Sequence, residues 1–238
     1  MRAPGESGRA GRRADGRGEN RIPPVTAVVV AIAVYALLPQ PLLFAPRFIV
    51  PAVELVLLVA MMITNPRREV ERSRWSRRAS LALAAVLIVT NLSALGLLLH
   101  ALLQPRTGGA PLLIGAAQVW LTNVIGFSLL YWELDRGGPV ARRSIARASL
   151  PPADWRFSQD ENDDNVVEVA RTSSARSDWI PVYVDYLYLS VTNSSAFSPT
   201  DTMPLSSRAK ALMALQATTA LFVTLILIAR AVGSLGGG

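Results

Sequence analysis

The apolar residues of this chain are gathered into five long blocks, and this grouping constrains the fold more than any other feature. The blocks are residues 23–38, 48–64, 79–103, 111–132 and 211–229. Glu54 is the single charged residue within them. A membrane-spanning helix needs about 20 mostly apolar residues, which the last three blocks provide. The first two are shorter and are separated by prolines, which favours a tight helical hairpin. The sequence therefore predicts an all-α integral membrane protein with about five transmembrane helices.

The composition argues against a soluble enzyme. Hydrophobic residues make up 51% of the 238 residues and charged residues 17%, whereas soluble domains carry about 25% charged residues. The chain has no cysteine and one histidine, which excludes thiol catalysis, disulfides and cysteine-ligated metals. Because no constellation of catalytic residues is found, we expect no enzymatic activity, no cofactor and no metal site.

The number of arginines alternates from one polar segment to the next. Residues 1–21 contain six, 39–47 one, 65–78 six, 104–110 one and 133–178 seven. Short cytoplasmic loops of membrane proteins are enriched in Lys and Arg. The alternation therefore predicts that the N-terminus, loop 65–78 and segment 133–178 are cytoplasmic.

These boundaries divide the chain into four parts. We expect residues 1–21 to be a disordered basic cytoplasmic tail and residues 22–132 to be a four-helix transmembrane region. Residues 133–178 would form a cytoplasmic loop, and residues 179–238 a re-entrant, pore-like element followed by the last transmembrane helix. A basic stretch before an apolar block is also typical of a signal peptide, but no clean cleavage site follows, so we expect the first helix to be retained.

The cytoplasmic loop contains the acidic run DENDD at residues 160–164. An EF-hand calcium loop that began at Asp160 would need Gly at its sixth position and Glu at its twelfth. The chain has Asn165 and Arg171 at these positions. We therefore interpret the run as a solvated acidic turn.

Residues 179–204 have the layout of a re-entrant element. The aromatic run 179–190 is too short to span a membrane and contains Asp185; a polar stretch, a turn and a full-length helix follow. Irregular backbone is tolerated at membrane depth only where protein buries it or water wets it. The alternative is that residues 179–197 cross as a sixth span, which the cost of an intramembrane Asp argues against.

The stretch from Leu187 to Pro204 resembles the pore helix and selectivity filter of potassium-channel pore domains. It reads LYLSVTNSSAFSPTDTMP where that family typically reads LYFSVTTLTTVGYGDxxP. The matching positions, with the arginine that follows, are Tyr188, Ser190, Val191, Thr192, Asp201, Pro204 and Arg208. The filter differs, because Ala196 to Thr200 replace TVGYG, whose glycines allow the carbonyls to line a potassium filter. The resemblance thus implies a pore-like element without potassium selectivity.

The same region also resembles the C-terminal end of an uncharacterised family of bacterial multi-pass membrane proteins. In that family a tyrosine- and serine-containing segment precedes a Ser/Thr-Asp turn, an arginine and a final helix, as Tyr188 to Arg208 do here. This resemblance implies a location in the bacterial plasma membrane and no particular activity.

Polar residues at membrane depth are candidate functional residues by default. Glu54 lies about 10 Å into the second helix. One interpretation is that Arg47 or interfacial water pairs with its carboxylate; the other is that the carboxylate is a proton or cation site. Asp185 either caps the short helix or belongs to such a site. Asn91, Asn123 and Gln216 either line a polar pathway or form ordinary interhelical hydrogen bonds. The full set of pathway candidates is Glu54, Asp185, Asn91, Asn123, Thr192, Ser195, Thr200, Asp201 and Gln216.

Two functions from different classes fit these features. The first is a channel-like or transport-related protein with ion permeation through an oligomeric pore, because one pore loop cannot close a pore alone. It implies a homo-oligomer in the lipid bilayer. The alternative is a non-transporting scaffold or partner subunit that binds a protein through loop 133–178. The basic loops are interpreted as topology signals, so no nucleic-acid partner is expected.

Overall fold

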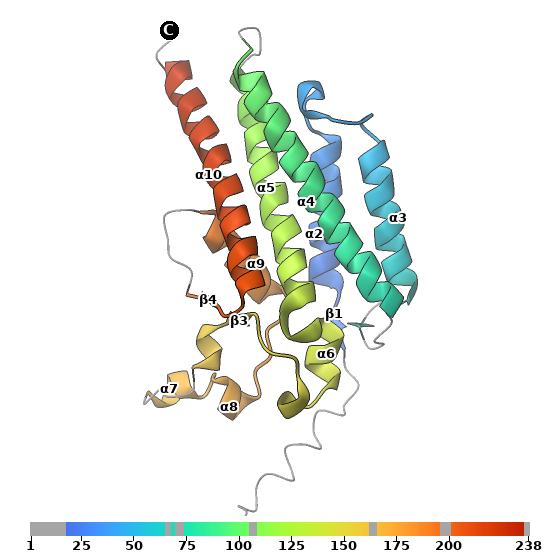
Figure 1. The fold of residues 1–238 in the computed structure, drawn as a ribbon, viewed down its shortest axis with the longest axis vertical. Helices are drawn as coiled ribbons and strands as arrows, with labels where there is room; N and C mark the ends of the chain where they lie inside the picture. The colour runs from blue at the N-terminus through green and yellow to red at the C-terminus, as the bar shows by residue number, and fades with distance from the viewer. Residues whose placement is uncertain are drawn as a thin grey trace, which may run out of the picture.

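The computed structural model describes residues 18–64, 68–69, 74–104, 109–161, 166–195 and 201–235. The described chain is mostly helical, and its long helices run side by side along one axis (Figure 1). They are α2 (Ile22–Ala36), α3 (Ile49–Thr64), α4 (Arg74–Leu102), α5 (Gly109–Leu134) and α10 (Ser207–Leu235). The prediction of a mostly helical protein is thus confirmed.

Within the described residues, three helices are long and apolar enough to cross a membrane. The candidate spans are Trp75–Leu102, Ala110–Gly137 and Ser207–Arg230. Helices α2 and α3 are also apolar. They contain 15 and 16 residues, fewer than the roughly 20 that a crossing needs. Three spans of the predicted five therefore have the required length, and the crossing of α2 and α3 stays a prediction.

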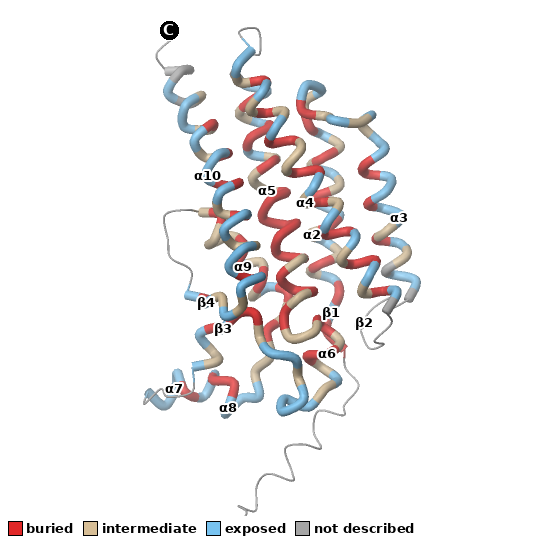
Figure 2. Tube along the Cα trace, in the orientation of Figure 1, coloured by how far each residue is buried: buried red, intermediate tan, exposed pale blue. Residues whose placement is uncertain are grey.

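Helix α5 lies at the centre of the bundle. It packs against α2, α4 and α10, and against the short helix α9 (Tyr183–Ser194). Figure 2 shows that α5 is largely buried, whereas α10 presents an exposed outer side. That side carries apolar residues such as Leu221, Phe222 and Leu225. Exposed apolar helix surface of this kind suits contact with lipid.

One end of the bundle, which we call the polar end, carries the short elements of segment 135–182 (Figure 1). They are α6 (Pro139–Ser144), β3 (Trp155–Arg156), α7 (Val167–Ala170), α8 (Ser174–Ser177) and the 3₁₀ turns Asp135–Gly137, Arg147–Ser149 and Ser158–Asp160. Strand β3 pairs with β4 (Met203–Pro204), and β1 (Glu19–Asn20) pairs with β2 (Arg68–Glu69), both antiparallel. The described parts of the three arginine-rich segments therefore lie at the same end.

The helix ends follow from local sequence. Pro23 and Pro24 stand in the first turn of α2, where the missing N–H costs nothing. At the other end of α2, the Arg47 guanidinium donates to the carbonyl of Ala36 at 2.5 Å. Helix α5 ends in a turn in which Gly137 has a φ of 82°, a left-handed conformation that glycine adopts without a steric penalty.

The predicted tail needs a correction at its C-terminal end. Residues 1–17 lie outside the described residues, but Glu19 and Arg21 are buried against the bundle. They belong to β1 and to the start of α2 rather than to a free tail. The polar sequence of this segment did not indicate burial, because its partners come from distant parts of the chain.

Helix α9 has 12 residues and lies beside α5 and α10 in the half of the bundle next to the polar end (Figure 1). It begins at the polar end, and β4, which precedes α10, lies at that end again. Residues 196–200, where the potassium-channel family has its filter, lie outside the described residues.

Candidate functional site

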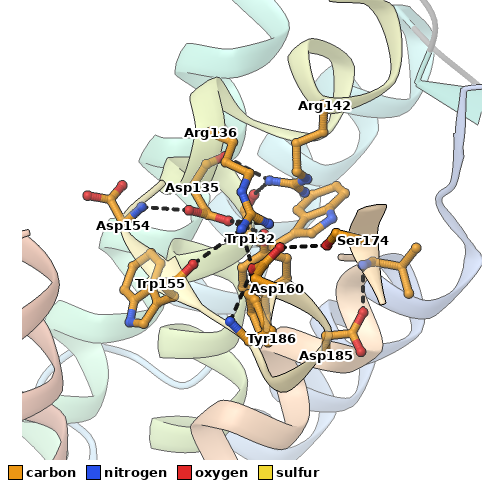
Figure 3. A network of polar contacts seen from close by, with 12 residues as sticks. Trp132, Asp135, Arg136, Arg142, Asp154, Trp155, Asp160, Ser174, Asp185 and Tyr186 are labelled. Carbon is orange, nitrogen blue, oxygen red and sulfur yellow. Dashed lines mark hydrogen bonds and ion pairs between the residues drawn. The ribbon is translucent and has the colours of Figure 1, made fainter. Parts of the chain in front are cut away.

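Asp135, directly after α5, is the centre of a buried polar cluster at the polar end (Figure 3). Its side chain is fully buried. One carboxylate oxygen accepts a hydrogen bond from the Tyr186 hydroxyl of α9 at 2.6 Å, and the other from the backbone N–H of Asp154 at 2.8 Å. The same carboxylate lies 3.6 Å from the guanidinium of Arg136. One side chain thus joins the end of α5 to α9 and to the segment before β3.

Glu19 of β1 extends this cluster to the N-terminal part of the chain. Its Oε1 accepts hydrogen bonds from the Trp132 indole and from the backbone N–H of Tyr183, both at 2.8 Å. Its Oε2 lies 3.5 Å from the Arg142 guanidinium. The first N–H groups of a helix have no partner within that helix. Glu19 therefore provides the missing acceptor at the start of α9.

Arg142 of α6 is completely buried, yet it stays charged. It donates to the backbone carbonyls of Trp132 and Asp135 at 2.8 and 2.9 Å. Its guanidinium carbon lies 5.0 Å from the centre of the Tyr186 ring, a distance suited to a cation–π interaction. Burial lowers the pKa of Arg142, but the surrounding groups, Glu19 among them, raise that pKa above its usual value overall.

The buried groups around Tyr186 keep its hydroxyl protonated, so that it donates a hydrogen bond to Asp135. Burial raises the pKa of this hydroxyl well above its usual value, and the adjacent carboxylate of Asp135 adds to the effect, while Arg142 opposes it. The hydroxyl therefore remains protonated and keeps its hydrogen bond to Asp135. The geometry is that of a fixed structural contact.

Two more ion pairs flank Asp135. Arg136 lies 2.5 Å from Asp160, whose other oxygen accepts from the Ser174 hydroxyl at 2.8 Å. Arg208, in the first turn of α10, holds Asp154 through two hydrogen bonds of 2.7 and 2.5 Å. Such bidentate pairs fix geometry as well as charge. The ion pairs thus fasten both the 158–174 region and the start of α10 to this cluster.

The acidic run therefore differs from the predicted solvated turn at its first residue. Asp160 is partly buried and paired, as described above. Residues 162–165 lie outside the described residues. Among the residues that the structure describes, no group of three or more His, Asp or Glu side chains could hold a metal ion.

Asp185 lies in the first turn of α9 at the polar end, where its Oδ2 accepts the backbone N–H of Val182 at 2.7 Å. This contact is a helix-capping contact, one of the two roles proposed from the sequence. Burial raises the pKa of Asp185, and the hydrogen bond from Val182 works in the opposite direction.

A shallow pocket of about 220 Å³ lies at the polar end. Its lining residues are Arg136, Arg147, Leu150, Pro151, Trp179 and Ile180. Arg136 is engaged by Asp160, and Arg147 lies 3.5 Å from Asp178 and donates to the carbonyl of Trp179. Because both guanidinium groups already have acidic partners, the pocket has little net charge to offer an anion.

Gln216 of α10 is the centre of a second polar cluster, deeper in the bundle. Its side chain is fully buried. Its amide nitrogen donates to the hydroxyls of Ser190 and Ser194 on α9 at 2.5 and 2.9 Å. Its amide oxygen accepts from the Tyr131 hydroxyl at 2.6 Å and from Asn193 at 2.9 Å. One amide group therefore holds α9, α5 and α10 together.

Asn91 and Asn123 make interhelical hydrogen bonds through their nitrogens only. Asn91 donates to the carbonyl of Val119 at 2.6 Å and to the Thr122 hydroxyl at 2.7 Å. Asn123 donates to the carbonyl of Gln216 at 3.4 Å. The amide oxygens of both residues are buried and have no hydrogen-bond partner among the described residues. The structure thus brings Asn123 and Gln216 together and leaves unused acceptors on Asn91 and Asn123.

Glu54 lies apart from both clusters, on the face of α3 that packs against α2 and α4. Its side chain is fully buried, and neither carboxylate oxygen has a hydrogen-bond partner among the described residues. Arg47, the partner considered from the sequence, donates to Ala36 instead. Glu54 is therefore a buried acid whose charge is not balanced by the predicted partner.

The remaining candidates make local contacts. The hydroxyls of Thr192 and Ser195 donate to carbonyls of their own helix, α9, at 3.0 and 2.7 Å. Asp201 is exposed and accepts from the Ser158 hydroxyl at 3.4 Å. Thr200 lies outside the described residues. The structure places none of these three described side chains in contact with Glu54.

Several residues of the polar-end cluster were missed by sequence reasoning: Glu19, Trp132, Asp135, Arg142, Asp154 and Tyr186. They lie in polar segments or at helix ends, where charged residues are common and carry no periodicity. Comparison of the chain with protein families, with curated proteins and with solved structures finds no match. Both resemblances of the C-terminal region therefore stay predictions.

Proposed function

We propose that the chain is a multi-pass protein of the bacterial plasma membrane with a transport-related function, in which Glu54 binds the ion. The single observation that carries the proposal is the complete burial of the Glu54 carboxyl group without a hydrogen-bond partner. An acidic side chain inside a membrane helix costs up to about 3 kcal/mol on insertion scales, with the highest cost at the helix centre. No structural contact of Glu54 offsets this cost, which favours a functional role for the carboxyl group.

Buried acceptor oxygens on the neighbouring helices support a route through the bundle. Gln118 of α5 and Asn91 of α4 have amide oxygens without a partner among the described residues, as does Asn123 one to two turns further along α5. Asn123 in turn contacts Gln216. Carbonyl oxygens can replace the hydration shell of a permeating cation. These groups would form the path between Glu54 and the polar end.

The proposal includes an orientation and an oligomeric state. The arginine-rich segments lie at the polar end, which would face the cytoplasm. Helix α9 starts there and β4 lies there again, which supports a re-entrant element entered from the cytoplasm. A homo-oligomer would complete the path, and the absence of filter glycines between Ala196 and Thr200 argues against potassium selectivity.

Ion flux into proteoliposomes tests the proposal. Purified protein is reconstituted, and fluorescent reporters follow protons and each alkali cation in turn. We expect flux with wild-type protein and with Glu168→Gln, a matched control whose carboxylate is exposed on α7, and loss of flux with Glu54→Gln. Wild-type flux equal to that of empty vesicles for every ion would exclude a transport function.

A second candidate, the non-transporting scaffold, is favoured by one observation. The polar face of α9 is engaged in hydrogen bonds to α5 and α10, through Gln216 above all. A helix whose buried polar side chains form hydrogen bonds with its neighbours suits a structural element that positions loop 133–178. A photo-crosslinker at Val169, an exposed residue of α7, should then trap one partner in fixed stoichiometry, and a deletion of the crosslinked partner should reproduce the phenotype of deleting this protein.

A further inference from the structure

We infer that the ion bound at Glu54 is a proton, held by the carboxyl group as a neutral acid, and that the Tyr35 hydroxyl completes the binding site. The inference rests on the proposed transport function and names the ligand of that same site. It goes beyond the flux proposal because it excludes a metal cation as the occupant of Glu54.

The position of Glu54 on its helix supplies the first argument. Val50, Glu54 and Leu58 follow one another at intervals of four residues and are all buried, so they lie on one face of α3. That face packs against α2 and α4. Glu54 lies about 8 Å from the start of α3, close to the end of the bundle formed by residues 37–48. The carboxyl group is thus enclosed by apolar side chains near one entrance to the bundle.

The groups around Glu54 supply the second argument. On α2, which packs against α3, the buried Tyr35 hydroxyl also has no hydrogen-bond partner among the described residues. The described ionisable side chains of α4 are Arg77 and Arg78 at one end and His100, which is exposed, at the other. Arg47, at the entrance to α3, donates to α2. Among these described ionisable groups, Tyr35 is the buried one, and its hydroxyl is neutral.

Coordination chemistry argues against a divalent metal cation here. Calcium takes six to eight oxygen ligands and magnesium about six, and an unpaired carboxylate in apolar surroundings is strongly disfavoured. Among the described residues, Glu54 belongs to no group of three or more acidic or histidine side chains that could hold a metal ion. A single bound proton needs no such ligand shell, because it converts the carboxylate into a neutral acid.

The proton balance of the site is simple. When Glu54 takes up a proton, its carboxyl group gains an O–H that can donate to the Tyr35 oxygen. When the proton leaves, the Tyr35 hydroxyl can donate to the carboxylate instead, and the tyrosine stays neutral in both states. No hydrogen bond joins the two groups in the structure, so the proposed exchange requires the two side chains to approach each other.

Labelling with dicyclohexylcarbodiimide tests the inference without measuring transport. This apolar reagent reacts with protonated carboxyl groups in apolar surroundings, and mass spectrometry of peptides from nanodisc-embedded protein identifies the labelled residue. We expect labelling of Glu54 that falls as the pH rises. Glu19 is an internal control, because it is buried but paired with Arg142 and should stay unlabelled. Tyr35→Phe, which removes the donor to the carboxylate, should extend labelling of Glu54 to higher pH.

The outcomes separate this inference from the proposed function. Unlabelled Glu54 in folded wild-type protein at every pH overturns the proton site, whatever the flux assay shows. Protection of Glu54 by sodium or potassium, relative to choline, also overturns it, while leaving transport in place. Labelling that follows pH and ignores these cations supports the proton site, even if the flux assay shows no transport.

Discussion

The carboxylate of Glu19 accepts a hydrogen bond of 2.8 Å from the backbone N–H of Tyr183, although 164 residues separate the two in sequence. The same carboxylate is paired with Arg142 at 3.5 Å. A strand before the first long helix thus provides the acceptor that the start of α9 lacks. The position of α9 in the bundle consequently depends on the N-terminal segment of the chain.

Glu19→Gln should therefore loosen the start of α9. The amide keeps an acceptor for Tyr183 but leaves the buried Arg142 without its anionic partner, which we expect to cost about 2–3 kcal/mol of unfolding free energy. Thermal unfolding in detergent measures the loss, and hydrogen exchange should show faster exchange in the first turn of α9. Glu168→Gln should leave both unchanged, and equal exchange in all three proteins would contradict the prediction.

Gln216→Leu should destabilise the contact between α9 and α10. It leaves the hydroxyls of Ser194 and Tyr131 without their buried partner, whereas the Ser190 hydroxyl still donates to the carbonyl of Val124. Each unsatisfied group costs about 1–3 kcal/mol. Thr224→Val on the same helix is the matched control, because the Thr224 hydroxyl bonds only to the carbonyl of Ala220. We expect the melting temperature to fall for Gln216→Leu and to stay nearly constant for the control. Equal melting temperatures for the two variants would show that the amide contributes little.

Asp185 predicts a pH dependence of stability with a definite sign. Burial raises the pKa of this carboxyl group in the folded protein above the value of about 3.9 expected for an unfolded chain. The folded state binds the proton more tightly, so the unfolding free energy falls as the pH rises through the folded-state pKa. Asp185→Asn should lose less stability than wild type between acidic and neutral pH. Melting curves recorded across that range test this, and parallel pH profiles would contradict it.

Glu54→Leu should separate stability from function. The leucine removes a buried acid without a hydrogen-bond partner and fills similar space, so we expect a gain of about 1–2 kcal/mol in unfolding free energy. Flux in proteoliposomes should be lost in the same variant. A destabilised Glu54→Leu protein would mean that the carboxyl group makes a stabilising contact, which would remove the main argument for its functional role.

The long helices could be predicted because long apolar segments favour burial away from water. Blocks 111–132 and 211–229 lie inside the candidate spans Ala110–Gly137 and Ser207–Arg230. The spans are longer than the blocks because polar turns continue the helix beyond the apolar part. The status of α2 and α3 could not be settled in the same way, since 15 and 16 residues fall between a core helix and a span.

The site was predictable only in part. Glu54 was found because it is the single charge in an apolar block. Asp135, Arg142 and Glu19 were not, because a charged residue in a polar segment carries no local sign of the partner it will meet. Trp132 and Glu19 are 113 residues apart and meet only through the tertiary fold.

The pairing of β1 with β2 closes the α2–α3 hairpin at the polar end, with Glu19 opposite Glu69, while Arg47 closes its other end on Ala36. The hairpin that carries Glu54 is therefore a closed loop of chain whose first strand also holds α9. The two-residue strand β1 therefore contacts both the hairpin that carries Glu54, through β2, and the first turn of α9, through Glu19.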